Sequence, residues 1–199
     1  MGSILVTGGA GYIGSHMVKT LVSAGRDVVV LDDLSSGHED AVHPKARFVR
    51  GDIRDSEKVR KIVADHAVEG TIHFAAKIQV GESMVKPRMY FQDNLVATLA
   101  LLETLLDAKV GTFILSSTAA VYGDPEYTPI DEDHPKRPVN TYGESKLFIE
   151  HALRRYHDAY GLKYAALRYF NASGADPAAG LGERHDPETH LIPLVLDAA

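Results

Sequence analysis

The sequence predicts an α/β protein built on a doubly wound parallel sheet. Short runs rich in β-branched residues alternate along the chain with longer segments of helical periodicity. A glycine-rich turn joins the first such run to the first helical segment. Because a repeated strand–helix–strand order gives parallel strands joined by crossover helices, these observations favour a single sheet wound in both directions.

The first half of the chain supplies four expected strands and two helices. The strands cover residues 3–8, 27–33, 46–52 and 71–76. The segment "GYIGSHMVKTLVSAG" between the first two strands has helical periodicity and ends at Gly25, a residue type that favours helix C-termini. A second helix is expected over 56–66, with Ser56 as its N-cap.

The second half continues the same alternation. A long helix over roughly 87–108 carries a leucine stripe, which we interpret as core. That stripe consists of Leu95, Leu99, Leu102 and Leu106. Strands are expected at 112–118 and 163–170, with a helix over 141–161 between them. After Gly174 the pattern gives way to a Pro/Gly-rich loop and then the opening turns of a helix. We therefore expect one domain over 1–174 and the start of a second, substrate-binding lobe over 175–199.

Composition narrows the function classes. The formal charge of −6 argues against a nucleic-acid-binding protein, which normally presents a basic face. The absence of cysteine excludes a disulfide scaffold and is compatible with a cytoplasmic location, which we expect. The longest apolar tract, residues 95–106, includes Glu103 and is too short to span a bilayer. No targeting segment is recognisable, so we expect no membrane association.

The segment "VTGGAGYIGSH" predicts a dinucleotide-binding loop. Gly8, Gly11 and Gly14 stand between a strand and a helix, where a tight turn must bring the backbone close to a pyrophosphate. The free N–H groups of the helix N-terminus favour the anion. Asp32 ends the next strand, near the spacing expected for a ribose-binding carboxylate. Since a carboxylate would repel a 2′-phosphate, NAD is favoured over NADP.

The segment "TYGESK" predicts a catalytic pair. Tyr142 and Lys146 are four residues apart, so on a helix they lie on one face. Ser116 and Thr118 come at the end of the preceding strand, the edge where open parallel sheets bind ligands. An ammonium and a cationic nicotinamide ring would both favour the phenolate of Tyr142. Tyr142 could then accept the proton of a substrate alcohol while Thr118 holds the same oxygen.

Four motifs together resemble the extended short-chain dehydrogenase/reductases. They are "TGGAGYIGSH", "SSTAAVYG", "YGESK" and "LRYFNASGA". Within that family the chain is similar to the enzymes that epimerise UDP-glucose at C4, a similarity that "GDIRD", "HFAAKIQVGESM" and "HDPETHLIP" extend through nearly the whole chain.

The resemblance implies a role for each matching residue. The cofactor-binding residues would be Gly8, Gly11, Tyr12, Ile13, Asp32, Ser35, Ser36, Asp52, Ile53, Phe74, Ala75, Ala76, Asn94, Ser116, Tyr142, Lys146 and Tyr169. The catalytic group would be Thr118, Tyr142 and Lys146. The substrate would contact Thr118, Tyr142, Phe170, Asn171, His190 and Leu191.

The resemblance also implies an activity and partners. NAD would serve as a bound cofactor in the interconversion of UDP-glucose and UDP-galactose through a 4-keto intermediate, and the full-length protein would form a homodimer. Two other hypotheses remain open: a uronate epimerase or decarboxylase, and a cofactor-binding domain without turnover. A dehydratase is disfavoured, because Ala119 and Ala120 stand where that chemistry needs an acid pair.

Some positions depart from the family pattern. Ile78 stands where some members have a cofactor-binding lysine, and Lys77 lies one residue earlier, so no cofactor role is assigned to either. His190 stands where other members have asparagine, and Thr118 replaces a serine while keeping the hydroxyl. His185 and His190 form a histidine pair without a clear third ligand, so we expect no metal site.

Overall fold

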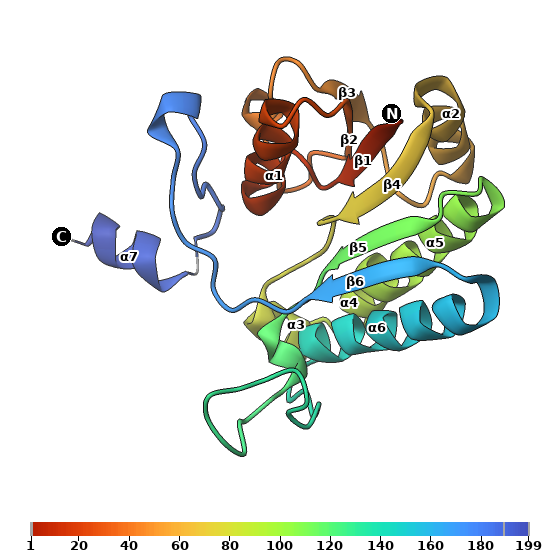
Figure 1. Ribbon diagram of the computed structural model, residues 1–199. Helices are drawn as coiled ribbons and strands as arrows, with labels where there is room; N and C mark the ends of the chain where they lie inside the picture. The colour runs from red at the N-terminus through yellow and green to blue at the C-terminus, as the bar shows by residue number, and fades with distance from the viewer. Residues whose placement is uncertain (1, 189, 199) are drawn as a thin grey trace.

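The computed structural model describes residues 2–188 and 190–198. Its centre is a six-stranded parallel sheet with the order β3-β2-β1-β4-β5-β6, shown in Figure 1. The strands are β1 (Ser3–Thr7), β2 (Val28–Asp32), β3 (Arg47–Arg50), β4 (Val68–His73), β5 (Thr112–Ser116) and β6 (Lys163–Leu167). The strand order reverses between β1 and β4, so this is the doubly wound sheet expected from the sequence.

Helices connect the strands and cover both faces of the sheet. They are α1 (Tyr12–Ser23), α2 (Ser56–His66), α3 (Val80–Val85), α4 (Pro87–Tyr90), α5 (Ala97–Asp107), α6 (Thr141–Tyr160) and α7 (Leu191–Asp197). A π-helical stretch, Phe91–Val96, joins α4 to α5. Each of the six expected strands has a counterpart in the sheet.

Side-chain alternation in the strands builds two separate cores. Leu5 of β1 belongs to a large core shared with α2, α5 and α6. Its neighbour Val6 points to the opposite face and packs with Val18 of α1. This alternation is the period-two geometry of a strand that is buried on both sides. In the leucine stripe, Leu102 is fully buried, and Leu95, Leu99 and Leu106 pack partly buried against the large core.

Three local expectations were wrong. The N-cap of α2 is Asp55 rather than Ser56, because the Asp55 carboxylate accepts the Lys58 N–H at 3.0 Å. Strand β4 begins at Val68 and ends before Phe74, since Val68 pairs with Ser3 of β1. The backbone N–H of Phe74 bonds Thr7 O at the end of the ladder. The single helix expected over 87–108 contains the π-helical stretch, which turns Asn94 into the interior.

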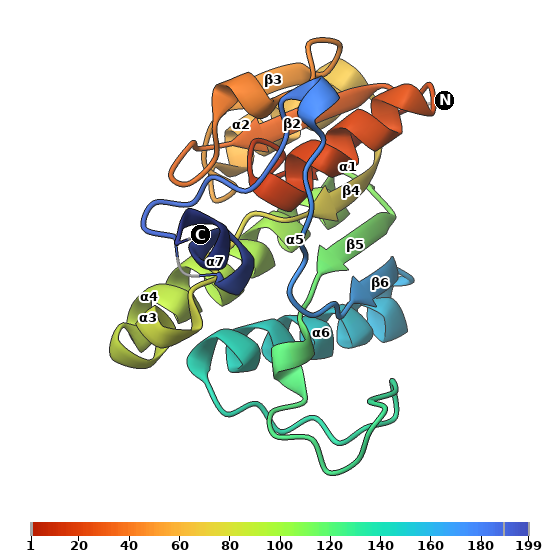
Figure 2. The ribbon, with the colours of Figure 1, turned by 90° about the vertical axis from the view of Figure 1, so that its left-hand side faces the viewer.

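The segment after β6 packs against the first helix. Figure 2 shows it passing beside α1 before it reaches α7. Tyr12 donates its phenol proton to Gly174 O at 2.6 Å, and Lys19 forms an ion pair with Asp176. Arg184 binds Asp40 at 2.7 Å, beyond the end of β2. Residues 174–184 are therefore fastened to the part of the sheet that carries the glycine-rich loop. No helix among the described residues is long and apolar enough to cross a membrane.

Candidate active site

The glycine-rich loop lies where the strand order reverses. Gly8 has φ +72°, and a Cβ there would stand 2.5 Å from the backbone nitrogen of Ala75, which follows β4. A Cβ on Gly14 would stand 2.1 Å from Gly8 O, so the first turn of α1 packs directly on the loop. Gly11 is the N-cap of α1 and provides no side-chain hydrogen bond. The N–H groups of this helix end are thus available to an anion.

We predict that Gly14→Ala destabilises the fold by about 1–3 kcal/mol and weakens dinucleotide binding, because the new methyl group forces the loop and α1 apart. Denaturant unfolding and dinucleotide titration measure the two effects. Gly81→Ala is the matched control, since a Cβ on that α3 residue meets no atom within 4 Å. Equal stability and equal dinucleotide affinity for the two variants would contradict the close packing described here.

Asp32 joins the glycine-rich loop to the end of β2. Its side chain is buried, with one carboxylate oxygen accepting Ala10 N–H at 3.0 Å and the other accepting Leu34 N–H at 2.9 Å. Burial raises the pKa of Asp32, while these two N–H donors act in the opposite direction. A carboxylate offers about four acceptor sites, so it can still accept a ribose hydroxyl after both backbone bonds are made.

Tyr142 and Thr118 meet at the edge of the sheet. Helix α6 begins immediately before Tyr142, because Asn140 caps it by accepting Gly143 N–H at 2.8 Å. Thr118 lies two residues after the end of β5, and its hydroxyl oxygen accepts Ala120 N–H at 3.1 Å. The same hydroxyl lies near enough to the phenol of Tyr142 to lower the pKa of that phenol. The structure therefore brings together the phenol and the hydroxyl that the sequence assigned to one substrate oxygen.

Lys146 lies one helical turn below Tyr142 and is 1% exposed. Its ammonium donates to Ser116 O at 2.9 Å, which anchors α6 to the end of β5. Burial lowers the pKa of Lys146 to about 8. His73 lies nearby at the end of β4, where burial and the charge of Lys146 lower its pKa to about 3, so His73 is neutral. Its two ring nitrogens contact the hydroxyls of Thr7 and Thr98.

The expected acidity of Tyr142 is not found. Burial raises its pKa to about 12, with the nearby Thr118 hydroxyl acting in the opposite direction. Lys146 was expected to lower this pKa, but its ammonium is directed to the Ser116 carbonyl and is itself costly to charge. In this structure the side chain at position 142 is therefore a neutral phenol at physiological pH, and the phenolate expected beside Lys146 and a cationic nicotinamide ring stays a prediction.

Two further predicted residues support this edge of the sheet. The hydroxyl of Ser116 hydrogen-bonds the phenol of Tyr169. Asn94 is fully buried, where its side-chain oxygen accepts Lys77 N–H at 2.8 Å and its amide donates to Ser145 Oγ at 3.2 Å. Asn94 thereby ties the segment after β4 to α6, one residue from Lys146.

The other predicted residues range from buried to exposed. Ile13 is in the first turn of α1, and Phe74, Ala75 and Ala76 follow β4. The Asp52 carboxylate binds Arg54 at 2.6 Å, and Ile53 is buried in the large core. Ser35, Ser36, Phe170, Asn171 and Leu191 are exposed. Ser36 and Tyr12 line a small pocket with Arg184 and His185. His190 is the N-cap residue of α7, away from Tyr142 in sequence and held among acidic side chains.

A buried polar network behind Thr118 was missed by sequence reasoning. Glu150 of α6 accepts the Ser117 hydroxyl at 2.5 Å and forms a bidentate ion pair with Arg168. Arg168 also donates to Tyr122 Oη at 3.0 Å. The hydrogen bond to Glu150 raises the pKa of Arg168 further, so the guanidinium stays charged. Only the adjacency of Ser117 to the predicted hydroxyls could have pointed to this network.

The glycine-rich loop lies where the strand order of the parallel sheet reverses, and the Thr–Tyr–Lys group lies at a neighbouring strand end. Together these two features define a nucleotide-cofactor enzyme of the short-chain dehydrogenase/reductase type. The chain belongs to the NAD dependent epimerase/dehydratase family, whose model matches residues 4–199. The family and fold expected from the sequence are thereby confirmed.

The relatives and neighbours give the same assignment. The chain is 49% identical over 197 residues to the UDP-glucose 4-epimerase of Lacticaseibacillus casei, covering 99% of this chain and 60% of that relative. It is 49% identical over 199 residues to that of Streptomyces lividans, again covering 60% of the relative.

The structure of UDP-glucose 4-epimerase from Brucella ovis in complex with NAD matches with a TM-score of 0.94 at 47% identity. That match covers 98% of this chain and 59% of the other. The chain spans about 60% of the length of the curated relatives it matches.

Proposed function

We propose that this chain is the NAD-binding and catalytic part of an epimerase that interconverts UDP-glucose and UDP-galactose. The observation that carries the proposal is the buried ammonium of Lys146, fixed to Ser116 O one helical turn from Tyr142, in the same sheet that carries the glycine-rich loop and Asp32. We also propose that residues 1–174 form the cofactor-binding domain and that residues 175–199 begin the substrate-binding lobe.

The glycine-rich loop and Asp32 have the features that binding of NAD requires. Gly8 and Gly14 let the loop pack directly against the backbone after β4 and against itself, and the uncapped N-terminus of α1 offers N–H donors to the pyrophosphate. Asp32 lies at the end of β2 with acceptor capacity for ribose hydroxyls and a charge that disfavours a 2′-phosphate. The likeness to a solved epimerase with NAD supports the same assignment.

Bound NAD would supply a hydride acceptor that later returns the hydride to the sugar. The residues of the chain would then handle the proton and the position of the substrate. Thr118 and Tyr142 would both hydrogen-bond the C4 hydroxyl, and Tyr142 would take its proton as general base and give it back as general acid. Lys146 would hold a positive charge close to the proton-transfer site, because it is fixed on the strand end by Ser116 O.

The substrate assignment rests on the relatives. The two relatives described above are named as UDP-glucose 4-epimerases. Phe170, Asn171, His190 and Leu191 are the residues that we propose contact the nucleotide sugar, and three of them are exposed in positions that a further lobe could cover. The competing activity is epimerisation or decarboxylation of a uronate. Assays with UDP-galactose and with UDP-glucuronate distinguish the two activities.

A chimera provides a direct test. In it, this chain replaces the matching N-terminal part of the Lacticaseibacillus casei relative, to which it is 49% identical. We expect the purified chimera to release NAD on denaturation and to convert UDP-galactose to UDP-glucose without added cofactor. UDP-glucuronate should remain unchanged. Chromatography of the released nucleotides and of the sugar nucleotides measures both outcomes.

Two results of this test would overturn the proposal. A chimera that retains NAD but leaves UDP-galactose unconverted is folded and lacks the activity. A chimera that consumes UDP-glucuronate instead has the competing activity. The 199-residue chain, assayed in parallel, separates cofactor binding from turnover, since release of NAD by this chain requires only the sheet edge described above.

We also propose a homodimer and a cytoplasmic location for the whole protein. Support for the homodimer is a set of exposed apolar side chains, Val96 and Phe148 among them, on neighbouring parts of the π-helical stretch and α6. Support for the cytoplasm is the absence of cysteine from a chain expected to act on nucleotide sugars.

A further inference from the structure

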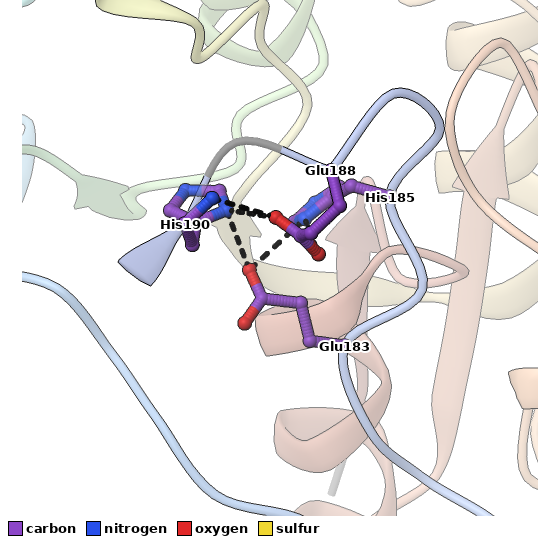
Figure 3. A group of neighbouring side chains, drawn as sticks. All are labelled: Glu183, His185, Glu188 and His190. Carbon is purple, nitrogen blue, oxygen red and sulfur yellow. Dashed lines mark hydrogen bonds and ion pairs between the residues drawn. The ribbon is translucent and has the colours of Figure 1, made fainter. Parts of the chain in front are cut away.

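Two histidines and two glutamates converge on the loop that precedes α7. Figure 3 shows Glu183, His185, Glu188 and His190 directed toward one another. Each offers one ligand atom, and these four atoms all lie within 4.8 Å of one another. The sequence analysis expected no metal because the histidine pair had no clear third ligand. The structure places two carboxylates there, so the objection no longer holds.

The spacing of these atoms matches a tetrahedral metal site. Zn²⁺ holds nitrogen and oxygen ligands at about 2.0–2.2 Å, which sets neighbouring ligand atoms about 3.3–3.6 Å apart. Glu183 lies 3.0 Å from His185 Nδ1 and 2.7 Å from His190 Nδ1. Glu188 lies 2.9 Å from His190 Nδ1 and 3.9 Å from His185 Nδ1. The two Glu188 distances are to different carboxylate oxygens, and the four ligand atoms of the cluster lie within 4.8 Å of one another, so side-chain rotations would bring them to the expected spacing.

The donor set is better suited to a dication than to pairwise ion pairs. His190 Nδ1 faces one oxygen of each glutamate, at 2.7 and 2.9 Å, although a single N–H can align well with only one of them. Two carboxylates and two imidazole rings also bring four ligand atoms to one point. Imidazole and carboxylate ligands together favour Zn²⁺ and neighbouring transition metals over Mg²⁺ and Ca²⁺, which prefer oxygen ligands only.

The site is partly enclosed and lies next to the glycine-rich loop. All four residues are only partly exposed, with side-chain exposures from 11% for Glu183 to 34% for His190. The His185 ring stands edge-on to Tyr12, with ring centroids 6.5 Å apart, and Glu183 contributes to a raised pKa of Tyr12. All ligands come from one eight-residue segment, so bringing them together closes only a short loop.

We propose that Glu183, His185, Glu188 and His190 form a binding site for a transition-metal dication of the Zn²⁺ type. The ion fixes the loop that precedes α7 beside Tyr12 of the glycine-rich loop. This site is separate from the Thr118–Tyr142–Lys146 group but shares His190 with the proposed nucleotide-sugar contacts, and its existence does not depend on the proposed epimerase activity.

Metal titration of the chain, stripped with a chelator and prepared without a histidine tag, tests the proposal. We expect one Zn²⁺ bound per chain in equilibrium dialysis, undiminished by excess Mg²⁺. Co²⁺ should give the intense visible absorption of tetrahedral coordination. The proposal would be overturned if bound Co²⁺ gave only the weak absorption bands of octahedral coordination, or if Zn²⁺ did not bind stoichiometrically. Neither result requires a variant.

Variants assign the ligands. Glu183→Gln keeps the shape of the side chain, and we expect it and His185→Ala each to weaken Zn²⁺ binding by about 10-fold or more, since even outer-sphere changes cost that much. His151→Ala, which removes an exposed histidine of α6, is the matched control and should bind as the parent chain does. Unchanged Zn²⁺ affinity in Glu183→Gln, with a circular dichroism spectrum like that of the parent, would show that the cluster is only a set of ion pairs.

Discussion

Replacing Tyr142 by phenylalanine is expected to lower turnover by about 10²–10⁴-fold in the chimera described above, the usual contribution of one positioned acid–base group. The variant removes only the phenol oxygen, the atom near which the Thr118 hydroxyl lies. Retention of NAD should be unchanged, because the glycine-rich loop and Asp32 lie on other strands. Assay of UDP-galactose conversion together with quantification of released NAD separates the chemical role from a folding defect.

Comparison of the parent chain with the same variant measures the pKa of the Tyr142 phenol. Burial raises the pKa of Tyr142 to about 12, so the difference in phenolate absorbance between the parent chain and Tyr142→Phe should appear only at strongly alkaline pH. A positive charge beside the phenol favours its ionised form, so we expect this signal at lower pH when oxidised NAD is bound. A Tyr142→Phe chimera with undiminished turnover, or a phenolate signal that NAD does not move, would contradict the assigned role.

The charge of Lys146 is confined to a limited pH range. Burial depresses its pKa to about 8, so its ammonium form predominates below that pH and is lost as the pH rises through it. Under the proposed function, the charge that would favour the Tyr142 phenolate is therefore available at neutral pH. As the pH rises through this pKa, the lysine can still donate to Ser116 O but loses its charge.

The parts of the molecule that sequence predicted are those whose signals are local. The loop from Gly8 to Gly14 is a continuous segment between a strand and a helix, and its structure follows from steric limits within a few residues. Tyr142 and Lys146 share a helix face because four residues make about one turn. The doubly wound parallel sheet followed from the regular alternation of strands and helices, since connection rules leave few other topologies.

The parts that sequence did not predict depend on contacts between distant segments. The direction of the Tyr142 pKa shift is set by how deeply the fold buries the phenol, which no local pattern encodes. The π-helical stretch around Asn94 is not visible in an ordinary helical period. Glu183 and Glu188 lie on a loop without periodicity, so only the folded loop shows that they face the two histidines.

Loss of Glu150 is expected to have the largest effect on stability. Its side chain is 7% exposed and that of Arg168 is 16% exposed, and the two are joined by a bidentate pair. Glu150→Ala would leave the Arg168 guanidinium and the Ser117 hydroxyl without their shared acceptor. We expect a loss of about 3 kcal/mol in the free energy of unfolding, at the lower end for a broken buried pair because Arg168 retains some solvent contact.

A matched control and a second variant make this expectation specific. Asp65→Ala breaks the exposed Lys61–Asp65 pair within α2 and should leave stability nearly unchanged. Arg168→Leu added to Glu150→Leu should recover much of the loss, because hydrophobic replacement of a whole buried pair removes the unpaired charge. Urea unfolding of the four chains measures these differences. If Glu150→Ala unfolds at the same urea concentration as Asp65→Ala, the buried pair does not stabilise the strand end that carries Thr118.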